Sequence, residues 1–125
     1  MSYPSFFDIA KQFKVIMLDS YGVVKNHNGL INGADKTLAF IRNEQKLFRI
    51  LTNDASRSPQ QQVDKYVELG LPGIHLHEMI TSGMMAKHFL EQKITSGKIA
   101  YLGTENSADY ILQAGLEHIA VADVF

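Results

Sequence analysis

Short apolar runs alternate with amphipathic segments along the chain. Val15 to Leu18 is a continuous apolar run, which is typical of a strand buried on both faces. Four later segments are also predicted to be strands: residues 48–51, 79–81, 98–102 and 119–121. Apolar residues at helical spacing predict five helices: residues 5–13, 34–44, 59–69, 82–92 and 106–114. This alternation predicts an α/β fold, a Rossmann-like parallel sheet with helices on both faces.

Polar residues mark where two of these helices begin. Ser58 precedes Pro59, and a hydroxyl followed by proline is typical of a helix start, with Gly70 suited to the left-handed residue at its end. Ser82 is the residue predicted to cap the next helix. The side chains predicted to face the core from these two helices are Val63, Tyr66, Val67, Met85, Ala86, Phe89 and Leu90. The segment between residues 21 and 33 is rich in Gly and Asn, which indicates turns.

Two of the predicted strands end in residues that can bind phosphate. Asp19 follows the first strand, and Thr52 and Asn53 follow the second. Because the carboxyl ends of parallel strands meet at one edge of the sheet, we expect these residues to share a site. A carboxylate can attack phosphorus or bind Mg²⁺, and a hydroxyl and an amide can donate to phosphate oxygens. From local sequence alone, the alternative is that the three residues only close turns.

Composition and charge narrow the classes of function. The chain has 12 basic and 13 acidic residues, and a formal net charge of −1 argues against a nucleic-acid or anionic-membrane partner. It has no cysteine, which excludes disulfides and thiolate chemistry. No apolar run reaches the ~18 residues that span a bilayer, and the N-terminus lacks the pattern of a signal peptide. We therefore expect a cytoplasmic protein that binds no membrane.

Residues 15–23, with the sequence VIMLDSYGV, resemble the first motif of the haloacid dehalogenase superfamily, in which four apolar residues precede Asp-x-Asp-Gly. Residues 50–53, ILTN, resemble its second motif. Further segments resemble the class IIA, NagD-type branch: residues 28–34, 52–58, 80–86 and 100–103. The resemblance implies an incomplete core. Residues 1–96 would be the N-terminal half of that core, and residues 97–125 would begin a truncated cap domain.

The resemblance also implies a chemistry, a Mg²⁺-dependent phosphatase that acts on a small phosphorylated metabolite through an aspartyl-phosphate. Asp19 matches the nucleophile, which is also a metal ligand, while Thr52 and Asn53 match the phosphate-binding positions. Tyr21 stands where the family has a second Asp as general acid and base. Its backbone carbonyl can still serve the metal, so we expect Asp19 and Tyr21 at the catalytic and metal positions. A phenol with a pKa near 10 is a poor base at neutral pH.

Two other functions stay open. The pattern Asp19-x-Tyr21-Gly22 also resembles 2-haloacid dehalogenases, which attack carbon and need no metal. The family's third and fourth motifs, with a Lys and paired acids for Mg²⁺, do not occur within these 125 residues. We therefore expect weak or absent Mg²⁺ binding and little turnover, and a catalytically inactive binding or assembly domain is the other alternative. A half-core leaves apolar surface and a sheet edge, which predicts a homo-oligomer.

Overall fold

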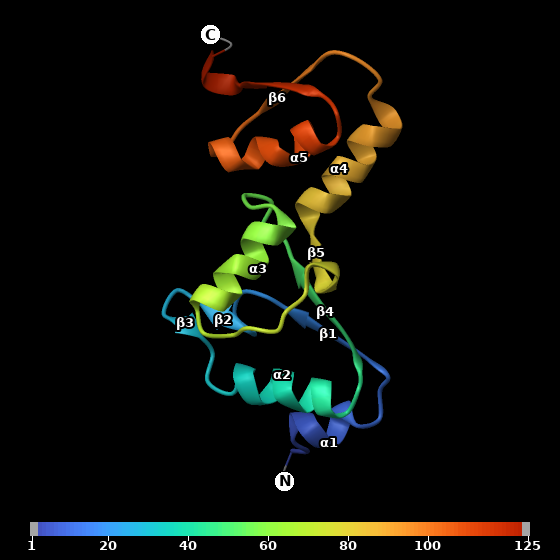
Figure 1. Ribbon diagram of the computed structural model, residues 1–125, viewed down its shortest axis with the longest axis vertical. Helices are drawn as coiled ribbons and strands as arrows, with labels where there is room; N and C mark the ends of the chain where they lie inside the picture. The colour runs from blue at the N-terminus through green and yellow to red at the C-terminus, as the bar shows by residue number, and fades with distance from the viewer. Residues whose placement is uncertain (1–2, 124–125) are drawn as a thin grey trace.

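The computed structural model describes residues 3–123 as an elongated molecule with one three-stranded sheet and two two-stranded sheets. The helices are α1 (Phe6–Ala10), α2 (Ala34–Asn43), α3 (Pro59–Glu68), α4 (Ser82–Lys93) and α5 (Asp109–Gln113). The strands are β1 (Val15–Asp19), β2 (Lys25–Asn26), β3 (Gly29–Leu30), β4 (Leu47–Thr52), β5 (Met79–Thr81), β6 (Lys98–Tyr101) and β7 (Glu117–Ala120). Short 3₁₀ helices cover Leu76–Glu78, Glu105–Ala108 and Val121–Asp123. In Figure 1, α1 and α2 lie at one end and α5 with β6 at the other, joined by α4.

The larger sheet is parallel, with the strand order β1-β4-β5. Asp19 pairs with Leu51, and Thr52 pairs with Thr81, so the three strands end together. The strands β6 and β7 form a separate parallel pair. The predicted α/β fold with a parallel sheet is therefore confirmed. The antiparallel hairpin of β2 and β3 was not predicted from the sequence, because each strand is only two residues long.

The core lies on one face of the β1-β4-β5 sheet. Ile16, Phe48 and Ile50 point to this face and are at most 7% exposed. They pack with Ile41 of α2 and Tyr66 of α3. Successive crossovers that run in the same direction, from β1 to β4 to β5, place both helices on the same face. Among residues 3–123, the helices α2 and α3 therefore cover one face of an incomplete core.

The helix α3 begins as its sequence predicts. The Gln61 amide donates to the Ser58 hydroxyl at 3.3 Å, and the Ser58 amide donates to the Gln61 side chain at 2.9 Å. This reciprocal pair is a capping box, and Pro59 occupies the first helical position. Gly70 then takes the left-handed conformation, with a φ of 86°, as predicted for the end of this helix.

The predicted start of α4 was wrong by one residue. Thr81 caps the helix, because its backbone is extended and its hydroxyl accepts from the Met84 amide at 3.1 Å. Ser82 is the first helical residue, and its hydroxyl donates to the Asn53 carbonyl at 2.8 Å. The Thr81 hydroxyl also pairs with the Tyr110 hydroxyl at 2.8 Å. The side chain of Thr81 therefore connects β5, α4 and α5.

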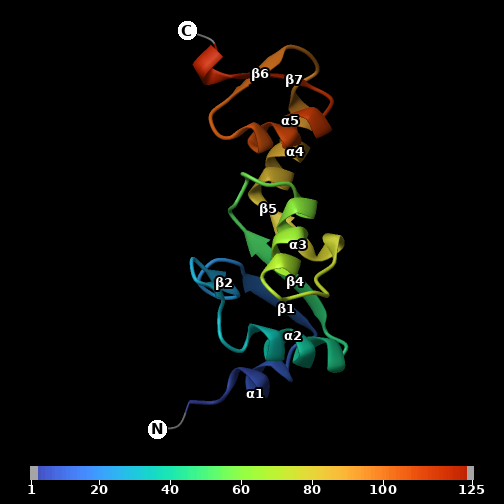
Figure 2. The same ribbon diagram turned by 60° about the vertical axis from the view of Figure 1, so that its left-hand side comes forward.

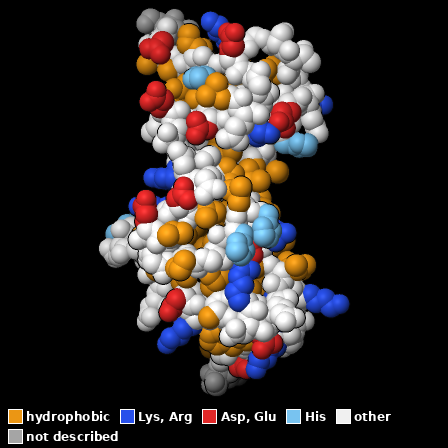
Figure 3. Space-filling view, viewed as in Figure 1, with side chains coloured by type: hydrophobic (Ala, Val, Ile, Leu, Met, Phe, Trp, Pro, Cys, Tyr) orange, Lys and Arg blue, Asp and Glu red, His pale blue; other side chains and the backbone are white. Residues whose placement is uncertain are grey.

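Four of the side chains predicted to face the core are exposed: Val67, Met85, Ala86 and Phe89. Figure 2 shows why the side chains of α4 are exposed. This helix leaves the larger sheet and runs toward the β6–β7 pair, so that only part of its surface meets a neighbour. Figure 3 shows hydrophobic side chains along the middle of the molecule, over α4 and the strands next to it. Within residues 3–123, no helix is both long enough and apolar enough to cross a membrane.

Candidate phosphate-binding site

A cavity of about 580 Å³ opens where β1 and β4 end. All four residues that the sequence singles out line it, namely Asp19, Tyr21, Thr52 and Asn53. The loop after β1 and the loop after β4 form its floor, and α3 and the β2–β3 hairpin contribute the other walls. The structure therefore brings the predicted site residues together in one cavity at the carboxyl edge of the sheet.

The loop after β1 presents Asp19 to the cavity. Its Oδ1 accepts a hydrogen bond of 2.7 Å from the Ser20 amide, and the side chain is exposed. Gly22 has a φ of 87°, a left-handed conformation that glycine adopts without strain, and its amide donates to the Lys25 carbonyl at 2.8 Å. The Ser20 hydroxyl is buried against the Tyr66 hydroxyl at 2.7 Å. The position of Asp19 is thus fixed by α3 as well as by its own strand.

Tyr21 faces the cavity from the same loop but makes few contacts. Its side chain is 63% exposed. The Ser20 and Lys25 carbonyls accept the nearby backbone hydrogen bonds. Within residues 3–123, the Tyr21 carbonyl accepts no backbone hydrogen bond. That carbonyl oxygen is therefore available to a ligand beside the Asp19 carboxylate.

The loop after β4 supplies donors. The Thr52 hydroxyl accepts from the Asp54 amide at 3.1 Å, which leaves its own proton for an anion in the cavity. The backbone of Asn53 is held by Ser82, and its side chain is exposed. The Ser20 amide donates to the Leu51 carbonyl at 3.1 Å, so the two loops adjoin directly. A phosphate near Asp19 can therefore reach donors from the second strand.

Asp54 is a site residue that the sequence reasoning missed. Its Oδ1 accepts from the Ser56 amide at 2.8 Å and from the Ser56 hydroxyl at 2.5 Å, and Arg57 donates to its Oδ2 at 3.1 Å. Partial burial raises the pKa of Asp54, but the hydrogen bonds from Ser56, together with the charge of Arg57, outweigh it and lower the pKa to about 2. An Asp two residues before a Ser is a signal for this kind of turn.

Three cationic side chains line the same cavity, namely Lys25, Arg57 and Lys65. The Lys25 Nζ lies 5.1 Å from the centre of the Tyr66 ring. Burial lowers the pKa of Lys25, and the charges of Arg57 and Lys65 lower it further, while Asp54 acts in the opposite direction. Lys25 is far from Arg57 and Lys65 in the sequence, so only the fold shows that it lines the same cavity.

A comparison with protein-family models matches residues 16–117 to the haloacid dehalogenase-like hydrolases, a range that contains both loops of the site. The chain belongs to this family. The match confirms the family that the two sequence motifs indicated, and it covers most of the 125 residues.

Three of the proteins that this chain is similar to are phosphatases by name. A possible sugar phosphatase of the haloacid dehalogenase superfamily from Cytophaga hutchinsonii is 39% identical, with a TM-score of 0.90 over 98% of this chain and 43% of that one. Phosphoglycolate phosphatase 2 of Arabidopsis thaliana is 30% identical over 72% of this chain and 29% of its own length. A glycerol phosphate phosphatase from Mycobacterium tuberculosis, solved in complex with magnesium, is 27% identical, with a TM-score of 0.73 over 89% of this chain and 33% of that one.

The chain therefore spans less than half the length of each of these three relatives. Their names favour phosphate-ester hydrolysis over the dehalogenase alternative. Among residues 3–123, no group of three His, Cys, Asp or Glu side chains is placed to hold a metal ion. The oxygens that fit Mg²⁺ are the Asp19 carboxylate and the Tyr21 carbonyl, a partial set for an ion that usually keeps several waters and binds substrate phosphate.

Proposed function

We propose that this chain carries the nucleophile and the phosphate-binding half of a Mg²⁺-dependent phosphate-monoester phosphatase. The observation that carries the proposal is the common cavity at the ends of β1 and β4, which contains Asp19 and Thr52. Membership of the haloacid dehalogenase-like hydrolases supports it. The substrate class is a small phosphorylated metabolite, in keeping with the names of the relatives.

In the proposed reaction, a carboxylate oxygen of Asp19 forms a bond to phosphorus while the bond to the ester oxygen breaks. The departing oxygen takes the electron pair and a proton from solvent water, and a second water then attacks the acyl phosphate, which releases inorganic phosphate and restores the Asp19 carboxylate. Thr52 and Asn53 donate hydrogen bonds to the phosphoryl oxygens, where negative charge is concentrated. When bound at Asp19 and the Tyr21 carbonyl, Mg²⁺ would neutralise part of that charge.

Tyr21 would take part through two different groups. Its carbonyl serves the metal, and its phenol lies on the cavity wall where a leaving oxygen can accept a hydrogen bond. A phenol is protonated at neutral pH and is a poor base, so activation of water is the step that this residue supports least. We therefore expect slow breakdown of the aspartyl-phosphate.

Three further parts of the proposal concern the domain boundaries, the oligomeric state and the location in the cell. Residues 1–96 form the N-terminal half of the core, and residues 97–125 begin a cap domain, because β6 and β7 pair with each other and not with the larger sheet. A second copy of the chain covers the bare face of the β1-β4-β5 sheet. The protein acts in the cytoplasm, in keeping with its lack of cysteine.

A second candidate is a catalytically inactive binding or assembly domain. It is favoured by the missing third metal ligand within residues 3–123 and by the exposed apolar side chains of the larger sheet. Such a domain would bind phosphorylated ligands at the same cavity without turnover.

The test is hydrolysis of p-nitrophenyl phosphate by this chain, with and without Mg²⁺. Asp19→Asn removes the nucleophile, and Asp64→Asn makes the same chemical change at an exposed position of α3 outside the cavity. The proposal predicts Mg²⁺-dependent turnover that falls by at least about 100-fold in Asp19→Asn and persists in Asp64→Asn. Equal turnover in Asp19→Asn would contradict the proposal, and no turnover in the unaltered chain would favour the inactive domain.

A further inference from the structure

Two of the three cations in the cavity, Lys25 and Lys65, come from β2 and α3 and not from the strand ends that carry Asp19 and Thr52. Asp19, Thr52 and Asn53 lie at one end, where the strands stop. Lys65 lines the cavity from the last turn of α3, six residues after Pro59, which is about 9 Å along a helix that rises about 1.5 Å per residue. Lys25 lines it from the first residue of β2. The cavity therefore continues past the phosphate site along a wall that carries positive charge.

From this arrangement we infer a second anion subsite, formed by Lys25 with Arg57 and Lys65, which selects phosphate monoesters that carry a further carboxylate or phosphate. The inference rests on the proposed phosphatase function, because it assigns the other end of the same substrate. It names the substrate class, a small metabolite with two anionic groups.

Lys25 is the central residue of the subsite. Arg57 already pairs with Asp54 at 3.1 Å, and Lys65 pairs with Glu68 at 2.9 Å. Lys25 has no carboxylate within 4.0 Å among the residues that the structure describes, although it is half-buried. A half-buried ammonium group without a charge partner gains most from an anion that enters the cavity.

The backbone around Lys25 fixes the position of this cation. Its carbonyl accepts from the Gly22 amide, and its amide donates to the Ser20 carbonyl, which ties it to the loop that carries Asp19. The Lys25 ammonium group lies over the ring of Tyr66, and the Tyr66 hydroxyl contacts Ser20. Through these contacts, the Lys25 ammonium is held at a set distance from the proposed nucleophile, as recognition of one bifunctional ligand requires.

The cavity is large enough for such a ligand. Its volume of about 580 Å³ falls within the range of roughly 300–1,000 Å³ that is typical of small-molecule sites. Three cationic side chains face two carboxylates, Asp19 and Asp54, across it. Asp54 is committed to Arg57 and Ser56, so the local excess of positive charge lies on the Lys25 side.

The test compares two ligands that differ at one group. The ligand 3-phosphoglycerate carries a carboxylate where glycerol 3-phosphate carries a neutral hydroxymethyl group. Both are titrated into the ¹⁵N-labelled 125-residue chain in the presence of Mg²⁺ and followed by amide chemical shifts, with inorganic phosphate as the probe of the phosphate site alone. A bisphosphate, glycerol 1,3-bisphosphate, distinguishes a second phosphate from a carboxylate.

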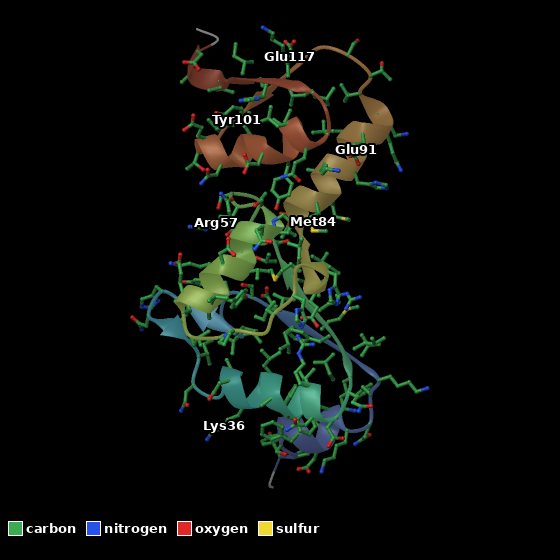
Figure 4. All side chains as sticks on the ribbon, in the orientation of Figure 1. Lys36, Arg57, Met84, Glu91, Tyr101 and Glu117 are labelled. Atoms are coloured by element: carbon green, nitrogen blue, oxygen red, sulfur yellow. The ribbon has the colours of Figure 1, made fainter. Side chains whose placement is uncertain are left out.

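The variant is Lys25→Gln, and its matched control is Lys36→Gln. Figure 4 labels Lys36 on α2, apart from Arg57 at the start of α3, and Lys36 does not line this cavity. Lysine in the first turn of a helix opposes the helix dipole, so its loss should not destabilise the fold. Unchanged thermal unfolding of both variants establishes that they are folded.

The subsite predicts that 3-phosphoglycerate or the bisphosphate binds roughly fivefold more tightly than glycerol 3-phosphate. This preference should disappear in Lys25→Gln, persist in Lys36→Gln and weaken as salt rises. Equal binding of all three esters, with inorganic phosphate still shifting Ser20 and Thr52, would overturn the subsite and leave the phosphate site intact. If no probe shifts these amides, the phosphate site fails, and the subsite fails with it.

Discussion

The two faces of the β1-β4-β5 sheet come from the same strands but have different environments. On one face, Ile16 and Ile50 are enclosed by α2 and α3 and are almost completely buried. On the other face, Met17 and Leu47 are 60% and 61% exposed. The apolar character of the strands is similar on both sides. The difference teaches that a continuous apolar run specifies a strand built for two covered faces, while residues 3–123 supply the cover for one of them.

The largest expected effect is on the covered face. Ile50→Ala should lower the free energy of unfolding by about 3 kcal/mol, because it leaves a cavity among fully buried side chains. In the single chain, at a concentration where it does not self-associate, Met17→Ala on the bare face should lower it by no more than about 0.5 kcal/mol. Urea unfolding of the two variants measures both values. Equal losses would show that the two faces do not differ in packing.

The next effect concerns the ion pair that attaches α2 to the segment before β5. Both Arg42 amino groups donate to the buried Glu78 carboxylate at 2.5 Å. Burial raises the pKa of Glu78, but the hydrogen bonds and charge of Arg42 outweigh it and hold the pKa below its usual value. Arg42→Met should cost about 2 kcal/mol in unfolding, since it leaves a buried charge without its partner.

A control for this variant is Lys65→Met, which removes a lysine from the exposed pair with Glu68. It should change unfolding by about 0.5 kcal/mol or less. If the two substitutions cost the same, the Arg42 pair contributes no more than a surface pair.

A smaller effect is expected at the site, as a dependence of stability on pH. The pKa of Asp54 is about 2 in the folded chain and 3.8 in an unperturbed carboxyl. A lowered folded-state pKa contributes stability that is present above about pH 4 and lost as the pH falls toward 2. With its partial exposure taken into account, we expect a loss of about 1–2 kcal/mol over that range.

Unfolding of Asp54→Asn across this pH range provides the measurement. The variant should lose that part of the pH dependence, while Asp64→Asn, at an exposed position of α3, should keep it. A pH profile that is identical in Asp54→Asn and the unaltered chain would contradict the contribution assigned to Asp54.

The smallest effect on stability is expected from charge on the bare face. Leu47→Lys should change unfolding of the single chain by about 0.5 kcal/mol or less, because the side chain is already exposed. If a second copy covers this face, the same substitution should reduce self-association strongly, since burial of an unpaired ammonium is unfavourable. Sedimentation equilibrium at several concentrations measures the change. A strictly monomeric unaltered chain would rule out the homo-oligomer.

Local signals in the sequence account for much of this fold. The apolar runs and the Ser58-Pro59 start place β1, β4 and α3 close to their observed bounds. The proximity of Asp19 and Thr52 followed from the rule that parallel strands end at one edge of a sheet. These predictions held because each depended on a few adjacent residues or on a general property of parallel sheets.

Features that depend on contacts distant in sequence could not be predicted in the same way. The exposure of Phe89 follows from what meets α4, which no spacing of its own residues reveals. Thr81 and Ser82 are equally suitable caps by type, and the pairing of Thr81 with Tyr110 is visible only in the fold. Lys25 and Lys65 are 40 positions apart in the sequence, so their common cavity required the packing of the hairpin near α3.

The most direct test of the central claim is to trap the proposed nucleophile. In the presence of Mg²⁺, trifluoroberyllate binds a reactive carboxylate oxygen with the geometry of a phosphoryl group, and ¹⁹F NMR reports the bound species. The account predicts a bound signal in the unaltered chain and in Asp64→Asn that is absent in Asp19→Asn. A bound signal that survives in Asp19→Asn, or its absence from the unaltered chain, would contradict the assignment of Asp19 as the nucleophile.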